Sequence, residues 1–211
     1  MIVDAKASGA YHWMAATILP RPIAWVATEN PNGTANLAPF SFFTGASASP
    51  PTCIICVSRT NKPTAEQPQV KGPSRKKDTW ANIERTGEYV INVVPDALAD
   101  AMNATSREVP HGTDEFELAG VTKEPSERVR PPRVAESPVA LECRLHKIVE
   151  VGNAGDETAI IVGEILLWRI HDDMLLENGR LDPAKLDLVG RMGGNWYSRT
   201  RDRFELARPK P

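Results

Sequence analysis

Short apolar runs separated by turn residues dominate the first third of the chain. Residues 22–28 (PIAWVAT) form one such run, and the Asn-Pro-Asn-Gly sequence at residues 30–33 is typical of a tight turn. Residues 34–37 can return as a second strand, and residues 52–58, rich in β-branched and small apolar side chains, as a third. The pattern predicts a β-hairpin followed by a further strand.

The middle of the chain changes to a helical pattern. Asp78 is placed to be the N-cap of a short helix, TWANIERTG, that ends at Gly87. Residues 88–94 then predict a strand, and residues 95–107 a second helix with an apolar face formed by Leu98, Ala101 and Met102. Before the first helix, the polar and proline-rich residues 61–78 predict a long functional loop such as a lid.

The last third predicts a long antiparallel pair of strands after an irregular, charged segment at residues 108–137. Residues 139–151 predict a half-buried strand, with apolar side chains alternating at Val139, Leu141, Cys143 and Leu145, and residues 159–170 are the expected partner strand across a turn at residues 152–156. Many short strands, few helices and proline-rich connections predict a mainly β fold. We expect one closed or nearly closed antiparallel barrel, with short helices and extended loops.

Composition narrows the class of protein. A chain of 211 residues with 41% hydrophobic content is long enough for one packed domain, which we place at about residues 10–199 with a tail at 200–211. The formal net charge of −2 offers no basic field for nucleic acid or an anionic membrane, so we expect a small-molecule ligand. Three cysteines and an N-terminus interrupted by Asp4 and Lys6 indicate a reducing, cytoplasmic location without an export signal.

Two segments could bind a ligand. Arg75, Lys76 and Lys77 run into the predicted helix start at Asp78 and Thr79, with Arg59 at the end of the preceding strand, which resembles a phosphate site. A solvated basic loop is the alternative. The uncharged residues 36–47, NLAPFSFFTGAS, suit the wall of a pocket for a flat heteroaromatic ring, although an ordinary strand with its phenylalanines in the core would have the same composition.

The other motifs in the sequence give weaker indications of a catalytic or ligand-binding role. Cys53 and Cys56 form a C-x-x-C, but a strand places residues three apart on opposite faces, which favours a structural role. His111 could face a ligand or lie in a surface loop, and Arg191 could bind an anionic group or pair with Asp187 or a second subunit. The sequence contains no nucleophile triad pattern, no G-x-G-x-x-G and no P-loop.

Seven segments taken in order resemble the flavin reductase-like family, over roughly residues 10–199. They are LPRPIAWVAT (19–28), NLAPFSFFTGAS (36–47), KDTWANI (77–83), EYVINVV (88–94), DEF (114–116), ESPVALEC (136–143) and GRMGGNWY (190–197). Members of this family are FMN-binding split barrels and usually homodimers. The uncharged stretch at residues 30–58 exceeds what a small barrel interior needs, which also favours a homodimer.

The resemblance implies a set of cofactor-binding residues. Those beside the flavin ring would be Asn36, Ala38, Ser41, Phe42 and Phe43. Those near the ribityl phosphate would be Ser58, Arg59, Lys77, Asp78 and Thr79, and Arg191 is a further candidate for ligand binding. No catalytic side chain and no metal are expected, because the flavin carries the chemistry.

The function implied is an FMN-dependent oxidoreductase that passes electrons from NADH or NADPH to flavin or another acceptor, such as a redox partner protein. Glu157 stands where the nicotinamide-dependent reductases of the superfamily tend to carry histidine, and a carboxylate there would repel a pyrophosphate. The resemblance is therefore to the flavoredoxin-like branch, and an FMN-binding electron carrier is the alternative. A barrel of this family that holds no flavin is a third reading.

Overall fold

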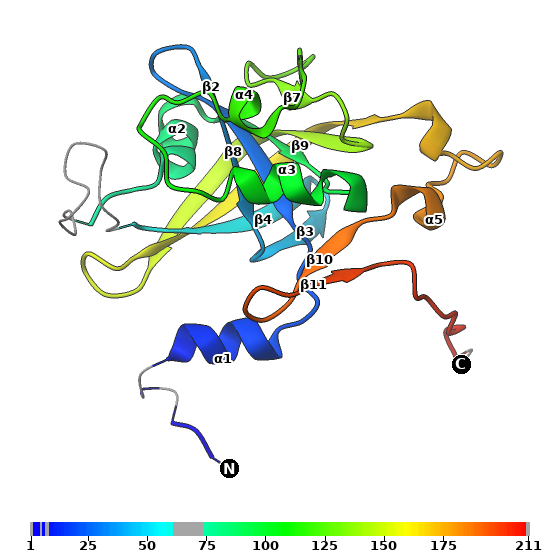
Figure 1. The fold of residues 1–211 in the computed structure, drawn as a ribbon, viewed down its shortest axis with the longest axis horizontal. Helices are drawn as coiled ribbons and strands as arrows, with labels where there is room; N and C mark the ends of the chain where they lie inside the picture. Colours follow the sequence, from blue (N-terminus) through cyan, green and yellow to red (C-terminus); the bar gives the residue numbers. More distant parts are fainter. Residues whose placement is uncertain (1, 5, 7–8, 61–73, 210–211) are drawn as a thin grey trace.

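A single antiparallel sheet of seven strands organises the molecule (Figure 1). The structure is a computed structural model that describes residues 2–4, 6, 9–60 and 74–209. The strands follow the order β2-β1-β5-β8-β9-β4-β3 across the sheet. Their bounds are β1 (Ala24–Glu29), β2 (Ala35–Phe40), β3 (Phe43–Ala48), β4 (Pro51–Ser58), β5 (Glu88–Asn92), β8 (Val139–Val151) and β9 (Thr158–Ile170).

The predicted first hairpin is confirmed. β1 and β2 pair antiparallel with Thr28 opposite Asn36, and the Asn30 N–H donates to the Thr34 carbonyl at 2.9 Å across the turn. Gly33 has φ of 84°, a left-handed conformation that glycine adopts without strain. The strands predicted at residues 52–58, 88–94, 139–151 and 159–170 also form, as β4, β5, β8 and β9.

The expected closed or nearly closed barrel is not closed by strand pairing in this structure. β2 and β3 are the two edge strands, and no ladder joins them in the described part of the chain. The free edge of β2 is covered instead by carboxylates, because Asp114 accepts from the Ala35 N–H at 3.4 Å and Glu115 from the Leu37 N–H at 2.6 Å. Backbone donors that are satisfied by side chains have no need of a neighbouring strand. The mainly β fold with short helices is confirmed.

Helices are short and lie at the ends and on the faces of the sheet. α2 was predicted, and it ends as expected at Gly87, with φ of 71°. It begins one residue earlier than predicted, because Lys77 is the N-cap and Asp78 the first helical residue. The α-helices are α1 (Ala10–Thr17), α2 (Asp78–Thr86), α3 (Ala99–Ala104), α4 (Glu115–Ala119) and α5 (Pro183–Leu186), and the 3-10 helices are η1 (Asp96–Leu98) and η2 (Asp172–Met174).

The predicted second helix forms as η1 and α3, and it ends at Ala104. The segment at residues 108–137, predicted as irregular, contains α4 and a two-stranded sheet of β6 (Lys123–Glu124) and β7 (Arg133–Val134). The predicted loop at residues 61–78 lies mostly outside the described residues. Near the C-terminus, β10 (Val189–Arg191) and β11 (Tyr197–Arg199) form a small hairpin that lies beside α1, below the sheet in Figure 1.

The core consists of two apolar clusters on opposite faces of the sheet. Neighbouring residues of one strand enter different clusters, as Trp25 and Val26 do, because side chains alternate along a strand. The first cluster includes Trp80 and Ile83 of α2, and the second includes Met102 of α3 and Phe116 of α4. The helices that border the candidate site are thus held by burial. In the described part of the chain, no helix has the length and apolar character needed to span a membrane.

Candidate ligand-binding site

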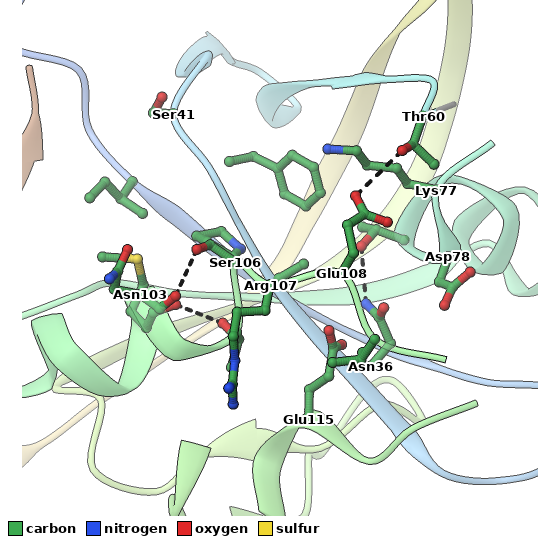
Figure 2. A pocket seen from close by; sticks show the side chains of 18 of the residues that line it. Asn36, Ser41, Thr60, Lys77, Asp78, Asn103, Ser106, Arg107, Glu108 and Glu115 are labelled. Atoms are coloured by element: carbon green, nitrogen blue, oxygen red, sulfur yellow. Dashed lines mark hydrogen bonds between the residues drawn. The ribbon is translucent and has the colours of Figure 1, made fainter. Parts of the chain in front are cut away.

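A cavity of about 510 Å³ opens beside β2. Its wall combines β2, the first turn of α2, and the segment from α3 to α4, with residues from α1 and the β10–β11 hairpin at the margin. Figure 2 shows Ser41, Lys77 and Glu115 converging on it from separate elements. A cavity of this volume is within the usual range for small-molecule and cofactor sites.

Seven of the eleven residues predicted from the sequence line this cavity. Asn36 is buried, and its Nδ2 donates to Thr79 Oγ1 at 3.0 Å, which ties β2 to the first turn of α2. A second buried contact holds the same helix, because Asn82 Nδ2 donates to Asn30 Oδ1 at 2.8 Å. The seven lining residues are Asn36, Ala38, Ser41, Lys77, Asp78, Thr79 and Arg191.

The first turn of α2 provides the polar end of the cavity. Lys77 is the N-cap residue in an extended conformation, and its side chain makes no capping hydrogen bond. The first intrahelical bond runs from the Ala81 N–H to the Lys77 carbonyl, so the amide groups of residues 78–80 precede the ladder. Lys77 Nζ lies 5.9 Å from the centre of the Phe40 ring. Helix amides, a lysine and the Thr79 hydroxyl are together suited to an anion.

Arg59 and Ser58 lie outside this lining. Arg59 Nε is 2.5 Å from Glu157 Oε2, and its guanidinium lies 5.3 Å from the ring centre of the buried Trp80. Lys76 lies 4.8 Å from the same ring and pairs with Glu84 at 2.8 Å. Ser58 is exposed and hydrogen-bonds Thr158 at 2.9 Å. The basic residues predicted as one site therefore divide into Arg75 and Lys77, which line the cavity, and Arg59 and Lys76, which do not.

The uncharged segment at residues 36–47 is divided by a turn. Ala38 and Ser41 reach the cavity, whereas Phe43 begins β3 and packs against the core beside β4. Phe42 is half-buried, with the Arg21 guanidinium 5.4 Å from its ring centre. Phe42 and Phe43 thus lie behind the wall that this segment forms.

Arg21 joins three parts of the chain at the margin of the cavity. Its buried guanidinium donates to Ser41 Oγ at 3.2 Å, to the carbonyls of Ala15 and Ile18 at 2.6 and 2.9 Å, and to the Met192 carbonyl at 3.0 Å. The cation therefore holds the end of α1 and the β10–β11 hairpin against the turn after β2. Sequence reasoning did not single out Arg21.

Arg191 and Tyr197 form the far margin. The Arg191 guanidinium lies 4.6 Å from the centre of the Tyr197 ring, and both residues line the cavity. The sequence left open a pairing of Arg191 with Asp187. In the structure Asp187 pairs with Arg201 at 2.7 Å instead, which lowers the pKa of the Asp187 carboxyl through that hydrogen bond.

Sequence reasoning missed the wall between α3 and α4. Met102, Asn103 and Ser106 come from α3 and the residues after it, and Glu108 reaches Thr60 Oγ1 at 3.4 Å. Glu115 was matched only as part of a short motif, with no role. Its position next to Phe116, an apolar residue expected in the core, was the one sequence feature that placed this carboxylate close to buried surface.

The remaining candidates have structural surroundings. His111 is exposed, and its Nδ1 lies 2.8 Å from Asp78 Oδ1 at the start of α2. Cys53 is buried and Cys56 half-buried on β4, both with free thiols. Among the described residues, no group of His, Cys, Asp and Glu side chains is arranged to bind a metal ion.

Comparisons with known proteins agree with this architecture. An uncharacterized protein of Deinococcus radiodurans is 41% identical over 208 residues, 95% of this chain and 85% of its own. Nitrilotriacetate monooxygenase component B of Bacillus cereus has a similar structure with a TM-score of 0.87, 26% identity, and 98% of each chain covered. The 2-nitrobenzoate 2-nitroreductase NbaA of Pseudomonas fluorescens gives a TM-score of 0.83, 27% identity, and coverage of 99% of this chain and 96% of its own.

A more distant structure has the same fold. Flavoredoxin of Desulfovibrio vulgaris (Miyazaki F) superposes with a TM-score of 0.74 at 20% identity, over 98% of this chain and 97% of its own. The flavin reductase like domain family matches residues 14–185, which include β1 to β9 and most of the cavity wall. The chain therefore belongs to the flavin reductase-like domain family.

Proposed function

We propose that this protein binds FMN in the cavity beside β2 and acts as an oxidoreductase that passes electrons from NADH or NADPH to flavin or another acceptor. One observation carries the proposal: a single cavity joins an uncharged wall at residues 38–41 to the N-terminus of α2, with Lys77 as its N-cap residue. FMN has two parts of matching chemistry, a flat ring system and a phosphate monoester.

The phosphate would bind at the first turn of α2. Lys77 supplies positive charge there, and the Thr79 hydroxyl and the first amides of the helix are donors. Arg59 was expected at this site from the sequence, but its side chain is engaged by Glu157 outside the cavity lining. We therefore assign the phosphate to Lys77 and Thr79 and leave Arg59 as a prediction to be measured.

The ring would lie against β2 and the turn after it. Ala38 and Ser41 have small side chains, which allow close approach of a ligand to the backbone, and Asn36 supplies an amide. Arg191 and Tyr197 close the opposite margin. Bound FMN would supply the redox chemistry, and the chain's residues would bind it, orient it and limit the access of water.

The surroundings of the Glu157 carboxylate bear on the binding of a nicotinamide nucleotide. Hydrogen bonds from the backbone N–H groups of Glu157 itself and of Gly155, together with the Arg59 guanidinium, hold the pKa of the Glu157 carboxyl below its ordinary value. The negative charge of Glu157 is thus compensated by Arg59 at 2.5 Å. The paired Glu157 carboxylate therefore repels the pyrophosphate of a nicotinamide nucleotide less than an unpaired carboxylate would. This supports the reductase over the electron carrier.

Flavin titration tests the binding proposal. Purified protein titrated with FMN should quench flavin fluorescence with one site per chain, and riboflavin, which lacks the phosphate, should bind at least about tenfold more weakly. Equal affinity for both ligands would remove the phosphate assignment. If the protein binds no FMN, the proposal is wrong, and the third reading, a member of this family that holds no flavin, takes its place.

Anaerobic stopped-flow absorption separates the reductase from the carrier. The FMN complex mixed with NADH or NADPH should lose its flavin absorbance rapidly with one of the two nucleotides. Reduction only by a separate electron-donating protein would establish the carrier instead.

A homodimer is the proposed assembly. Apolar side chains are exposed on α1 and beside it, including Tyr11 at 72% and Ile18 at 53%, and Trp196 of the adjacent hairpin is 78% exposed. β3 is exposed along five of its six residues. A second copy would cover such a surface. Analytical ultracentrifugation should give a dimer that Ile18→Glu weakens, and a monomeric parent protein would contradict the assembly.

A further inference from the structure

Glu115 places a carboxyl group in the cavity with one oxygen held and the other directed to the ligand space. The residue is only 6% exposed, yet it lines the cavity. Its Oε2 accepts the Leu37 N–H at 2.6 Å. Within the described ranges, Oε1 has no hydrogen bond or ion pair. Figure 2 shows the group rising from α4 toward the same space as Asn36 and Glu108.

The preceding residue provides a comparison within the same turn of chain. Asp114 also covers the free edge of β2, through the Ala35 N–H, but it forms an ion pair with Lys123. Burial opposes ionisation of Asp114, and the hydrogen bonds of Lys123 and Ala35 outweigh it, so the pKa of this carboxyl is lowered. Asp114 is therefore an ordinary, paired carboxylate.

Glu115 has the opposite surroundings. Burial, followed by the charges of Asp78, Asp114 and Glu108, raises the pKa of the Glu115 carboxyl to about 8, against the lowering effect of the Leu37 N–H. An acid that is buried among other acids is favoured in its neutral form.

The charged groups that border Glu115 make their contacts with residues other than Glu115. From α2, Asp78 is paired with His111, and Lys77 lies over the Phe40 ring. From the segment after α3, Glu108 is 3.7 Å from Arg75, and Arg107 Nε donates to the Ala104 carbonyl. From α4 itself, Asp114 is paired with Lys123. Each neighbouring acid thus has a basic partner, whereas Glu115 has, among the residues that the structure describes, the Leu37 N–H only.

We propose that Glu115 is a ligand-binding residue that remains uncharged in the cavity and donates a hydrogen bond from Oε1 to a neutral acceptor atom of the bound ring system. The proposal rests on the proposed function, because the ring system is that of the flavin. An uncharged acid offers a donor without adding charge beside the phosphate site.

The sign of the pH dependence follows from the chemistry. When the carboxyl group loses its proton, the donor disappears and a buried negative charge faces the ring acceptor. Affinity for FMN should therefore fall as pH rises through the pKa of about 8. Glutamine keeps an acceptor for the Leu37 N–H and a donor for the cavity at every pH, which makes Glu115→Gln the matched variant.

The test is the FMN dissociation constant of the parent protein, Glu115→Gln and Glu115→Ala at about pH 6.5 and about pH 9, with thermal melting to verify folding. The parent should bind about tenfold more weakly at the higher pH. Glu115→Gln should stay within about threefold of the parent at the lower pH and show no such loss, and Glu115→Ala should be weaker at both. Riboflavin, titrated in parallel, removes the contribution of phosphate ionisation.

The outcomes are distinguishable. A parent protein that binds FMN equally at both pH values, with Glu115→Ala unaffected, would overturn the role of Glu115 and leave FMN binding intact. Loss of affinity in Glu115→Gln at the lower pH, without a pH effect in the parent, would show that the charged form is needed, which also overturns the proposal. A parent that binds no FMN at either pH would overturn the proposed function itself.

Discussion

Two basic surfaces lie near the start of α2, and they differ in whether the cation lines the cavity. The inner surface, Lys77 with Thr79, lines the cavity. The outer surface, Arg59 with Lys76, stacks on the buried Trp80 ring and pairs with Glu157 and Glu84. Consecutive lysines at residues 76 and 77 belong to different surfaces, because the backbone at Lys77 is extended before the helix begins.

The difference shows that a run of basic residues is not one binding site. A cation stacked on an aromatic ring and paired with a carboxylate would have to give up those contacts to bind a ligand. A cation at a cavity margin beside helix amides gains contacts on binding. Variants of the two surfaces should therefore have unequal effects on the affinity for FMN.

The largest effect is expected from Lys77→Glu. The change removes a charged partner of the phosphate and places a like charge beside it, so FMN affinity should fall by about 100-fold or more. Fluorescence titration measures this directly. Riboflavin affinity should change much less, and an equal loss for both ligands would mean that Lys77 supports the cavity rather than the phosphate.

A smaller effect is expected from Thr79→Val. Valine keeps the shape of the side chain but removes the hydroxyl, which costs a donor to the phosphate and the acceptor of the Asn36 amide. FMN affinity should fall by about tenfold, measured by isothermal calorimetry. Thr79→Ser retains the hydroxyl and is the matched control, so a similar loss in both variants would refute a hydrogen-bonding role.

The smallest effect on affinity is expected from Arg59→Gln. Because Arg59 lies outside the cavity lining and is engaged by Glu157 and Trp80, the FMN dissociation constant should change by less than about threefold. The melting temperature should fall instead. Lys76→Gln, on the same outer surface, should behave alike, and a large loss of affinity in Arg59→Gln alone would return Arg59 to the phosphate site.

Much of the fold could be predicted from local sequence patterns. The Asn-Pro-Asn-Gly turn and the glycine that ends α2 each act within a few residues, and both appear as expected. The strand β8 also forms as predicted, but residues 139–143 are buried on both faces, so its burial does not follow the expected alternation. The covering of the free β2 edge could not be predicted in this way. It depends on Asp114 and Glu115 reaching the edge of β2 from about 78 residues away, as the paired contacts show.

Part of the candidate site could also be predicted from local sequence patterns. Asn36, Ala38 and Ser41 belong to one strand and its turn, and Lys77 to Thr79 to one helix start, so short segments identify them. The wall from Asn103 to Glu108 has no distinctive residue pattern, and contacts between distant parts of the chain position it, such as the bond from Trp25 Nε1 to Thr105 Oγ1 at 2.9 Å. Burial and pairing, which decide the roles of Glu115 and Arg59, are properties of the assembled fold.

The Arg21 contact has a consequence for the order in which the chain is assembled during synthesis. The guanidinium needs the carbonyl of Met192, which lies 171 residues further along the chain. On the ribosome, domains form as the chain emerges from its N-terminus, so this margin of the cavity stays incomplete until the β10–β11 hairpin has been released. A nascent chain stalled before residue 190 would contain all seven strands of the sheet and would lack a finished ligand site.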